Sequence, residues 1–218
     1  MHGEPNSLEN GFTVVHEDQW ILVLDKGCGL LAVPGIGEEK RDCLATRVAA
    51  KFPGARIVHR LDRDTSGLMV MARDAHSHRH ISRQFETRGV EKRYAAIVAG
   101  CPAEDEGTID LPIAKDLLRP PRQRVDEEHG RPSVTHWRVV ERLADPARAR
   151  LILHPITGRS HQLRLHLLVI GHPILGDDLY APDEVRAMAP RLCLHAAHLN
   201  FVHPSTREPV TFDSPAPF

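Results

Sequence analysis

The sequence lacks any hydrophobic stretch long enough to form a membrane-spanning helix. The longest strictly apolar run within a helical pattern is Leu167–Ile170, whereas a transmembrane helix needs about 20 such residues. The first ten residues include Glu4 and Glu9 and no apolar stretch, so they do not resemble a signal peptide. These absences predict a soluble, cytoplasmic protein.

Metal-binding, redox and nucleotide-binding motifs are also missing. The cysteines are too widely spaced for a zinc or redox motif and too few for a disulfide scaffold, so we expect free thiols: Cys28, Cys43, Cys101 and Cys193. Among the 15 histidines, His161 and His166 are five residues apart, whereas a helical zinc pair is four apart. With no glycine-rich phosphate loop or dinucleotide fingerprint, we expect neither a metal nor a nucleotide cofactor.

Lysine is scarce, and the charge is unevenly distributed. The net charge is −1, and only five of the 28 basic residues are lysines. The basic excess lies in residues 55–93, which carry a net charge of +4 and four histidines. Arginine suits phosphate groups and base edges better than lysine does. The net charge argues against a nucleic-acid partner, whereas the local arginine excess suits one. An arginine-rich proteome explains the composition at least as well.

The periodicity of apolar residues predicts more strands than helices. We expect helices over residues 43–52, with Asp42 as N-cap, 75–88 and 160–170. We expect strands over residues 12–16, 20–26, 67–72, 93–99, 134–141, 150–154, 192–201 and 210–212, and a basic loop over 118–132. Many strands follow one another directly, which is typical of an α+β fold with a mainly antiparallel sheet. No linker is evident, so we expect a single domain around a central cleft.

The densest polar cluster runs from His59 to Gly67, directly before the apolar run Leu68–Met71. A turn rich in ionisable groups and anchored to a buried strand can present a rigid reactive group. Asp62 is the better candidate for such a group, because Leu61 and two arginines flank it. The alternative is a structural turn in which the carboxylates bond only to nearby amides.

A second cluster extends from Thr157 to His166. In a helix beginning at Ser160, Leu163 and Leu167 would share one face, and Arg164 would lie between that face and a polar one. The alternative to a functional Arg164 is a solvated arginine on an ordinary amphipathic helix.

These clusters resemble the motifs of the RluA-type RNA pseudouridine synthases. The resemblance rests on the run His59-Arg60-Leu61-Asp62, continued by Thr65-Ser66-Gly67. Other matching stretches follow in the expected order: Lys26–Leu31 with Val33–Gly35, Lys92–Tyr94, Gly158–Arg164, Gly171–Asp177 and Leu194–Ala196. They span about residues 26–204. Gly27-Cys28 and Arg131 depart from the residues that are common in the family.

The resemblance implies that the sheet is bent and mixed. It also implies isomerisation of uridine to pseudouridine in RNA, without cofactor or metal. It assigns catalysis to Asp62, Tyr94 and Arg164, with Arg164 forming an ion pair with Asp62. Asp62 either attacks C1′ or removes the 2′ proton. Arg60, supported by His59, would fill the stack that the flipped nucleotide leaves, and Leu194 would line the base site. Arginines of the long loop would contact phosphates: Arg119, Arg122, Arg124 and Arg131.

The resemblance is to the short branch of the family that lacks the RNA-binding S4 domain. We therefore expect a brief N-terminal extension over residues 1–11 and a pseudouridine synthase catalytic domain over 12–218, acting as a monomer. The founding member of this branch modifies stem-loops of large-subunit ribosomal RNA and of the tRNA anticodon arm. Two alternatives stay open: an inactive RNA-binding module of the same fold, and a hydrolase built on the histidines and the Asp62/Asp64 pair.

Overall fold

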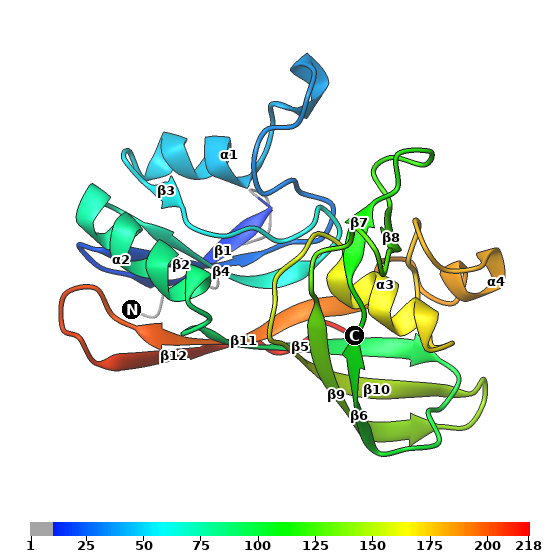
Figure 1. Cartoon of the computed structure of the whole chain (residues 1–218). Coiled ribbons are helices and arrows are strands. Elements are labelled where there is room, and N and C mark those ends of the chain that lie inside the picture. Colours follow the sequence, from blue (N-terminus) through cyan, green and yellow to red (C-terminus); the bar gives the residue numbers. More distant parts are fainter. Residues whose placement is uncertain (1–10) are drawn as a thin grey trace, which may run out of the picture. The chain divides into compact units, whose positions relative to one another are not determined.

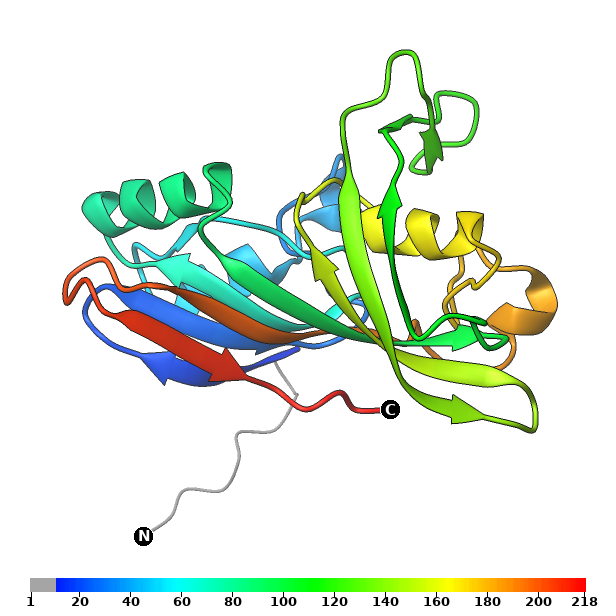
Figure 2. The same ribbon diagram turned by 60° about the horizontal axis from the view of Figure 1, so that its bottom comes forward.

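The computed structural model describes residues 11–218, so the expected extension over residues 1–11 falls almost wholly outside it. The chain forms two compact units. The first contains the N-terminal part up to Lys92 together with Ala196–Pro217, and the second contains Arg93–His195 and Phe218. Figures 1 and 2 show the course of the chain. Strand β11 (Leu194–Val202) contributes its first two residues to the second unit and the others to the first.

The first unit is an antiparallel sheet with two α-helices. Strands β1 (Phe12–Glu17) and β2 (Ile21–Lys26) form the predicted hairpin, and β2 also pairs with β4 (Ser66–Ala72). The short β3 (Arg56–Ile57) pairs with β4, and β12 (Pro209–Asp213) pairs with β11. In the hairpin turn the Asp18 carboxylate accepts hydrogen bonds from the Trp20 and Ile21 amides, both at 2.7 Å. This side chain fixes the reversal, because it satisfies amides that the turn leaves without a strand partner.

Helix α2 (Ala75–Glu86) covers one face of the first unit's sheet, as Figure 1 shows. Asp74 caps its N-terminus by accepting hydrogen bonds from the amides of His76 and Ser77. Ile81 is buried against Leu68 and Val70 of β4. The predicted helix over 75–88 is therefore confirmed apart from its last two residues.

Helix α1 (Leu44–Lys51) is present where we expect it, but its predicted cap is wrong. The N-cap is Cys43, and Thr46 Oγ1 accepts a hydrogen bond from the Cys43 amide at 3.1 Å. Asp42 lies one residue too early for the cap, and its carboxylate binds the Arg47 guanidinium at 2.5 and 2.7 Å instead. A short 3₁₀-helix, η2 (Glu38–Lys40), precedes α1.

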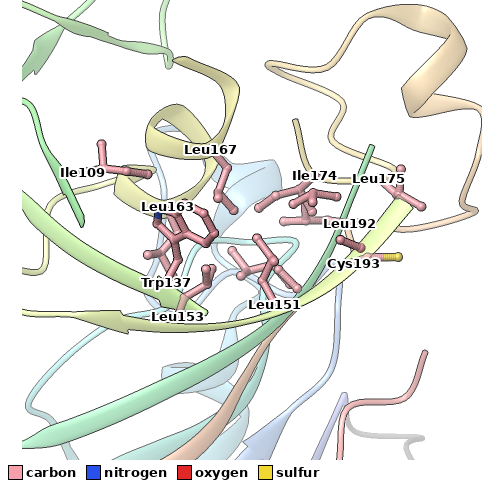
Figure 3. Packing of buried hydrophobic residues seen from close by; sticks show 14 residues of the cluster. Ile109, Trp137, Leu151, Leu153, Leu163, Leu167, Ile174, Leu175, Leu192 and Cys193 are labelled. Carbon is pink, nitrogen blue, oxygen red and sulfur yellow. The ribbon is translucent and has the colours of Figure 1, made fainter. Parts of the chain in front are cut away.

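The second unit contains an antiparallel sheet that packs against one helix. Strand β10 (Arg148–Pro155) pairs with β5 (Glu91–Ala99) and with β9 (Val134–Leu143), and β9 pairs with β6 (Glu106–Asp110). Helix α3 (Gln162–Val169) buries Leu163 and Leu167 against this sheet, in the core that Figure 3 shows. The turn α4 (Asp183–Arg186) follows. The predicted α+β class with a mainly antiparallel sheet is confirmed.

The segment predicted as the loop 118–132 contains a strand, so that prediction is wrong in part. Strand β8 (Gln123–Val125) pairs antiparallel with β7 (Ile113–Lys115) to form a separate two-stranded hairpin. Three residues are too few to show alternation in the sequence, and the partner strand supplies the pairing that the pattern cannot reveal. We call residues 113–125 the basic hairpin.

Candidate active site

The segment that carries Asp62 lies between β3 and β4 and has no regular secondary structure. Leu61 is buried, Asp62 is half-buried, and Arg60 is exposed. All seven residues of the following strand β4 are buried. The Leu61 side chain therefore faces inward, while its two neighbours remain accessible to solvent.

The start of β4 is fixed by a close backbone approach that requires glycine. Gly67 has a φ of +113°, and a Cβ at this position would lie 2.4 Å from the carbonyl oxygen of Ala196 in β11. Only a residue without a side chain fits a positive φ and this contact together. The four residues between Asp62 and Gly67 are thus tied to a rigid strand.

Lys26, at the end of β2, fastens the same segment from the other side. Its side chain is fully buried. Nζ donates hydrogen bonds to the carbonyl oxygens of Gly27 and Leu30, both at 2.8 Å, and of Arg63 at 2.9 Å. The ammonium has three protons, and these three acceptors can use all of them. Lys26 thereby joins the loop that follows β2 to the residue next to Asp62.

His59 is held to the first unit by two contacts. Its Nε2 accepts a hydrogen bond from the Val70 amide at 3.0 Å, and its ring stacks on Phe85 of α2 with centroids 4.4 Å apart. Burial, with a further contribution from the charge of Lys92, lowers the pKa of His59 to about 3. The imidazole is therefore neutral at physiological pH, as an acceptor of an amide proton must be.

The second carboxylate of the motif, Asp64, forms an ion pair with its neighbour. Asp64 binds the neighbouring Arg63 guanidinium, with Nε at 3.0 Å from Oδ1 and Nη2 at 3.0 Å from Oδ2. Arg63 is thus committed to Asp64. For Asp64 the structure shows an ion pair with a neighbouring side chain, whereas the structural alternative predicts contacts to nearby amides.

In the second unit, Tyr94 and Leu194 belong to one hydrophobic cluster. Tyr94 lies on β5 opposite Leu153 of β10 and packs, half-buried, against the core of this unit. Leu194, the first residue of β11, is a buried member of the same core. The structure therefore brings the predicted tyrosine and the predicted apolar wall to one cluster.

Arg164 is buried in helix α3, so the alternative of a solvated arginine is wrong. It is 2% exposed, and Asp177, which binds it, is 1% exposed. Nε and Nη2 of Arg164 lie 2.8 and 2.5 Å from the two Asp177 oxygens, and Nη2 lies 2.9 Å from Asp178 Oδ1. Two parallel bonds orient the planar guanidinium rigidly.

The segment before α3 is organised by Gln162. Its Oε1 accepts hydrogen bonds from the Thr157 hydroxyl and the Arg159 amide, and its Nε2 donates to the Val134 carbonyl and to Thr135 Oγ1. The side-chain amide of Gln162 therefore accepts two hydrogen bonds and donates two, which satisfies its full hydrogen-bonding capacity. This explains why a polar residue can be buried at the start of the helix.

Tyr180 connects α3 to the basic hairpin. Its hydroxyl accepts a hydrogen bond from the Gln123 amide at 2.7 Å, so its own proton is available to His161 Nδ1 at 2.8 Å. The guanidinium carbons of Arg122 and Arg164 each lie 5.4 Å from the centre of its ring. One buried phenol therefore packs against both Arg122 of the basic hairpin and Arg164 of α3.

The four predicted phosphate-binding arginines lie together on the basic hairpin and its return. Arg119 binds Asp116 at 2.8 Å, Arg124 binds Asp126 at 2.6 Å, and Arg122 packs on the Tyr180 ring. The exposed Arg131 pairs through its backbone with Ile113. Aspartates partly neutralise two of these four arginines. The hairpin therefore has only a weak net positive potential, but its guanidinium groups are held in defined orientations.

Not every expected contact lies within one unit. Asp62 belongs to the first unit and Arg164 to the second, so their ion pair stays a prediction. Sequence reasoning gave no role to Lys26, Asp177 or Tyr180, although all three lie in or next to the quoted motifs. The spacing Asp177-x-x-Tyr180 directly after a glycine could have indicated a capped turn, because the Asp177 carboxylate accepts a hydrogen bond from the Tyr180 amide.

Over residues 11–218 no three histidines, cysteines or acidic residues come together as a metal site would require. All four cysteines are free thiols, as predicted. No helix of the described part of the chain has the length and apolar character that a membrane crossing demands.

Comparison with known proteins identifies the class. Residues 20–168 match the family described as RNA pseudouridylate synthase, and the chain belongs to this family. It is therefore an isomerase that acts on RNA, converting uridine to pseudouridine.

The relatives narrow the class to the RluA type. The chain is 48% identical to the dual-specificity RNA pseudouridine synthase RluA of Escherichia coli K12, over 96% of this chain and 95% of the relative. Identity to the RluA of Pasteurella multocida is 44%, over 94% and 93%. Among solved structures, human RNA pseudouridylate synthase domain containing 1 superposes with a TM-score of 0.81 at 31% identity, covering 99% of this chain and 87% of that one. The predicted RluA-type resemblance is confirmed.

Proposed function

We propose that this enzyme modifies uridines in two classes of RNA: stem-loops of large-subunit ribosomal RNA and the anticodon arm of tRNA. The observation that carries this proposal is the 48% identity, across nearly the full length of both chains, to a relative described as having dual specificity. We further propose that residues 12–218 act as the catalytic domain, and that the enzyme works in the cytoplasm as a monomer without metal or nucleotide cofactor.

In this proposal Asp62 is the catalytic carboxylate, and it either attacks C1′ or removes the 2′ proton. The reaction breaks the C1′–N1 bond, turns the uracil and joins C5 to C1′, with no redox change. Arg164 keeps Asp62 ionised by a direct ion pair. Its fixed orientation on Asp177 supports this role, because a guanidinium held by one carboxylate can still offer N–H groups to another. Tyr94 stacks on the target base and assists the final proton transfer, and Leu194 lines the base site.

Access to the reacting atoms requires the nucleotide to leave the RNA stack, at a cost of a few kcal/mol. We propose that Arg60 occupies the vacated position, since a guanidinium plane can stack in place of a base. Its exposure supports this role. His59 positions Arg60 in this proposal. The hydrogen bond of His59 with the Val70 amide and its stacking on Phe85 fix the orientation of the imidazole ring. Arg119, Arg122, Arg124 and Arg131 contact phosphates.

The two aspartates of the motif offer a matched test of the catalytic assignment. Asp62→Asn removes the ionisable group with almost no change in shape, and Asp64→Asn makes the same change two residues away. We expect Asp62→Asn to abolish tritium release from C5-labelled uridine in RNA while RNA binding persists. Asp64→Asn should retain most of the activity. Substantial turnover by Asp62→Asn would show that another residue performs the chemistry.

The dual specificity is tested separately. Pseudouridine mapping of cellular ribosomal RNA and tRNA, with and without the gene, should reveal sites of both classes that depend on this chain. Purified enzyme should restore them on transcripts of the corresponding stem-loops. Restoration in only one class of RNA would contradict the proposal of two substrates.

A further inference from the structure

The tip of the basic hairpin presents two leucines to solvent. Leu117 is 85% exposed and Leu118 is 92% exposed, although both side chains are large and apolar. Single exposed aliphatic residues are common on protein surfaces. Two adjacent ones at the end of an arm that projects from its unit, as Figure 2 shows for the second unit, are a more specific feature.

The tip is not a loose loop, because Asp116 organises it. The Asp116 carboxylate is buried and accepts hydrogen bonds from the Leu118 amide at 3.1 Å and from Arg119 Nε at 2.8 Å. The backbone closes through Asp116 N–H to the Arg122 carbonyl at 3.0 Å and Arg122 N–H to the Arg119 carbonyl at 2.9 Å. The two leucines therefore lie in a turn whose conformation is set before any partner binds.

The root of the hairpin is equally well fixed. Ile113 is buried against Leu165 of α3 and against Tyr180, and Val125 packs on the same cluster. The hydrogen bond from the Gln123 amide to the Tyr180 hydroxyl adds a polar contact at 2.7 Å. A rigid support for an exposed apolar pair lowers the entropy that binding must remove, which is how preorganised contact surfaces gain affinity.

We propose that Leu117 and Leu118 form an apolar contact surface for unstacked bases of the RNA substrate. The basic residues of the same arm indicate this partner, because Arg119, Arg122 and Arg124 bring a phosphate backbone to the hairpin. Next to that backbone, apolar side chains can contact the faces of bases that leave the stack, as apolar wedges do in other nucleic-acid complexes. The inference rests on the proposed function and adds a contact that carries no charge.

The test compares the double variant Leu117→Ser/Leu118→Ser with two others. Ile36→Ser is the matched control, because Ile36 is 94% exposed and lies in the first unit. Arg119→Gln removes a charge from the same tip. The dissociation constant of a stem-loop substrate is measured for each protein across a range of salt concentrations, together with pseudouridine formation.

We expect the leucine variant to bind RNA about tenfold more weakly, which corresponds to about 1.4 kcal/mol, with an unchanged dependence on salt. Arg119→Gln should instead lower the slope of log affinity against log salt, by about 0.7–0.9 if one phosphate contact is lost. Ile36→Ser should match the wild type. The leucine and isoleucine variants should unfold at the same temperature as the parent, because Leu117, Leu118 and Ile36 are exposed.

Unchanged RNA affinity in the leucine variant would overturn the inference, and so would an equal loss in Ile36→Ser. A wild-type protein that sediments as a dimer, and a leucine variant that sediments as a monomer with full RNA affinity, would assign the surface to a second copy of the chain. The proposed function fails separately, if the wild-type enzyme forms no pseudouridine in the substrate.

Discussion

Replacing Lys26 by methionine tests whether the buried ammonium positions the Asp62 segment. Methionine has a similar length but no donor, so the carbonyls of Gly27, Leu30 and Arg63 lose their hydrogen bonds, now 2.8–2.9 Å long. A hydrogen bond to a charged group contributes about 1.5–3 kcal/mol. The loss of the three hydrogen bonds is partly offset, because the variant no longer has to remove a charged ammonium from water. We expect the free energy of unfolding to fall by about 3 kcal/mol.

The catalytic effect should exceed the effect on folding. At a temperature where the variant is fully folded, the Arg63 carbonyl is no longer held and the backbone next to Asp62 gains freedom. A misplacement of about 1 Å in a catalytic group can cost roughly a hundredfold in rate, so we expect kcat to fall at least tenfold with KM changed less.

Urea unfolding and single-turnover kinetics on the same preparations give the two quantities. Lys51→Met is the control, because Lys51 is exposed at the end of α1, and this change should leave both stability and kcat close to wild type. The reasoning is refuted if Lys26→Met unfolds within about 0.5 kcal/mol of wild type, the usual range for surface changes, and retains kcat.

Three further predictions concern the other contacts. Tyr180→Phe should keep the ring but lose the bond from the Gln123 amide, raising KM for RNA severalfold at constant kcat; a fall in kcat alone would contradict this. Because the pKa of His59 is about 3 in the folded state and about 6.5 in the unfolded chain, stability should decline as pH falls from 6.5 towards 3, by up to about 1.4 kcal/mol per unit. His59→Gln should flatten this decline in urea titrations, and parallel curves would refute it. Gly67→Ala should lower the free energy of unfolding by at least about 2 kcal/mol. Gly29→Ala is the control and should cost less, because Gly29 also has a positive φ but a Cβ there would meet no atom within 4 Å. Equal losses of stability in thermal unfolding would exclude the clash.

The sequence predicts well those elements that have long apolar patterns and clear end signals. The strand over 67–72 and the helix over 75–88 are found within two residues, because the apolar run Leu68–Met71 and a long segment of helical composition are strong local signals. Strands β7 and β8 escape prediction for the opposite reason. Each has three residues, and their stability comes from pairing and from packing on Leu165 and Tyr180.

The environment of Arg164 shows where local pattern stops being informative. On the helix its position between an apolar and a polar face fits a solvated side chain. Its burial depends on Asp177, which lies 13 residues further along the chain. A carboxylate that far away leaves no trace in helical periodicity, so only the resemblance to a known family favoured a functional Arg164 over a solvated one. The role of Lys26 escapes prediction for the same physical reason, because its third acceptor, the Arg63 carbonyl, lies 37 residues away.

The contact of Gly67 with Ala196 has a consequence for synthesis of the enzyme. The N-terminal part of the first unit, up to Lys92, emerges from the ribosome long before the strand that β4 needs as its neighbour. Until residues 196–202 are made, β4 presents an open edge, which invites pairing with other chains. The nascent polypeptide therefore needs its last tenth both to cover the edge of β4 and to complete the fold of the first unit. A product truncated before β11 should be inactive and should aggregate.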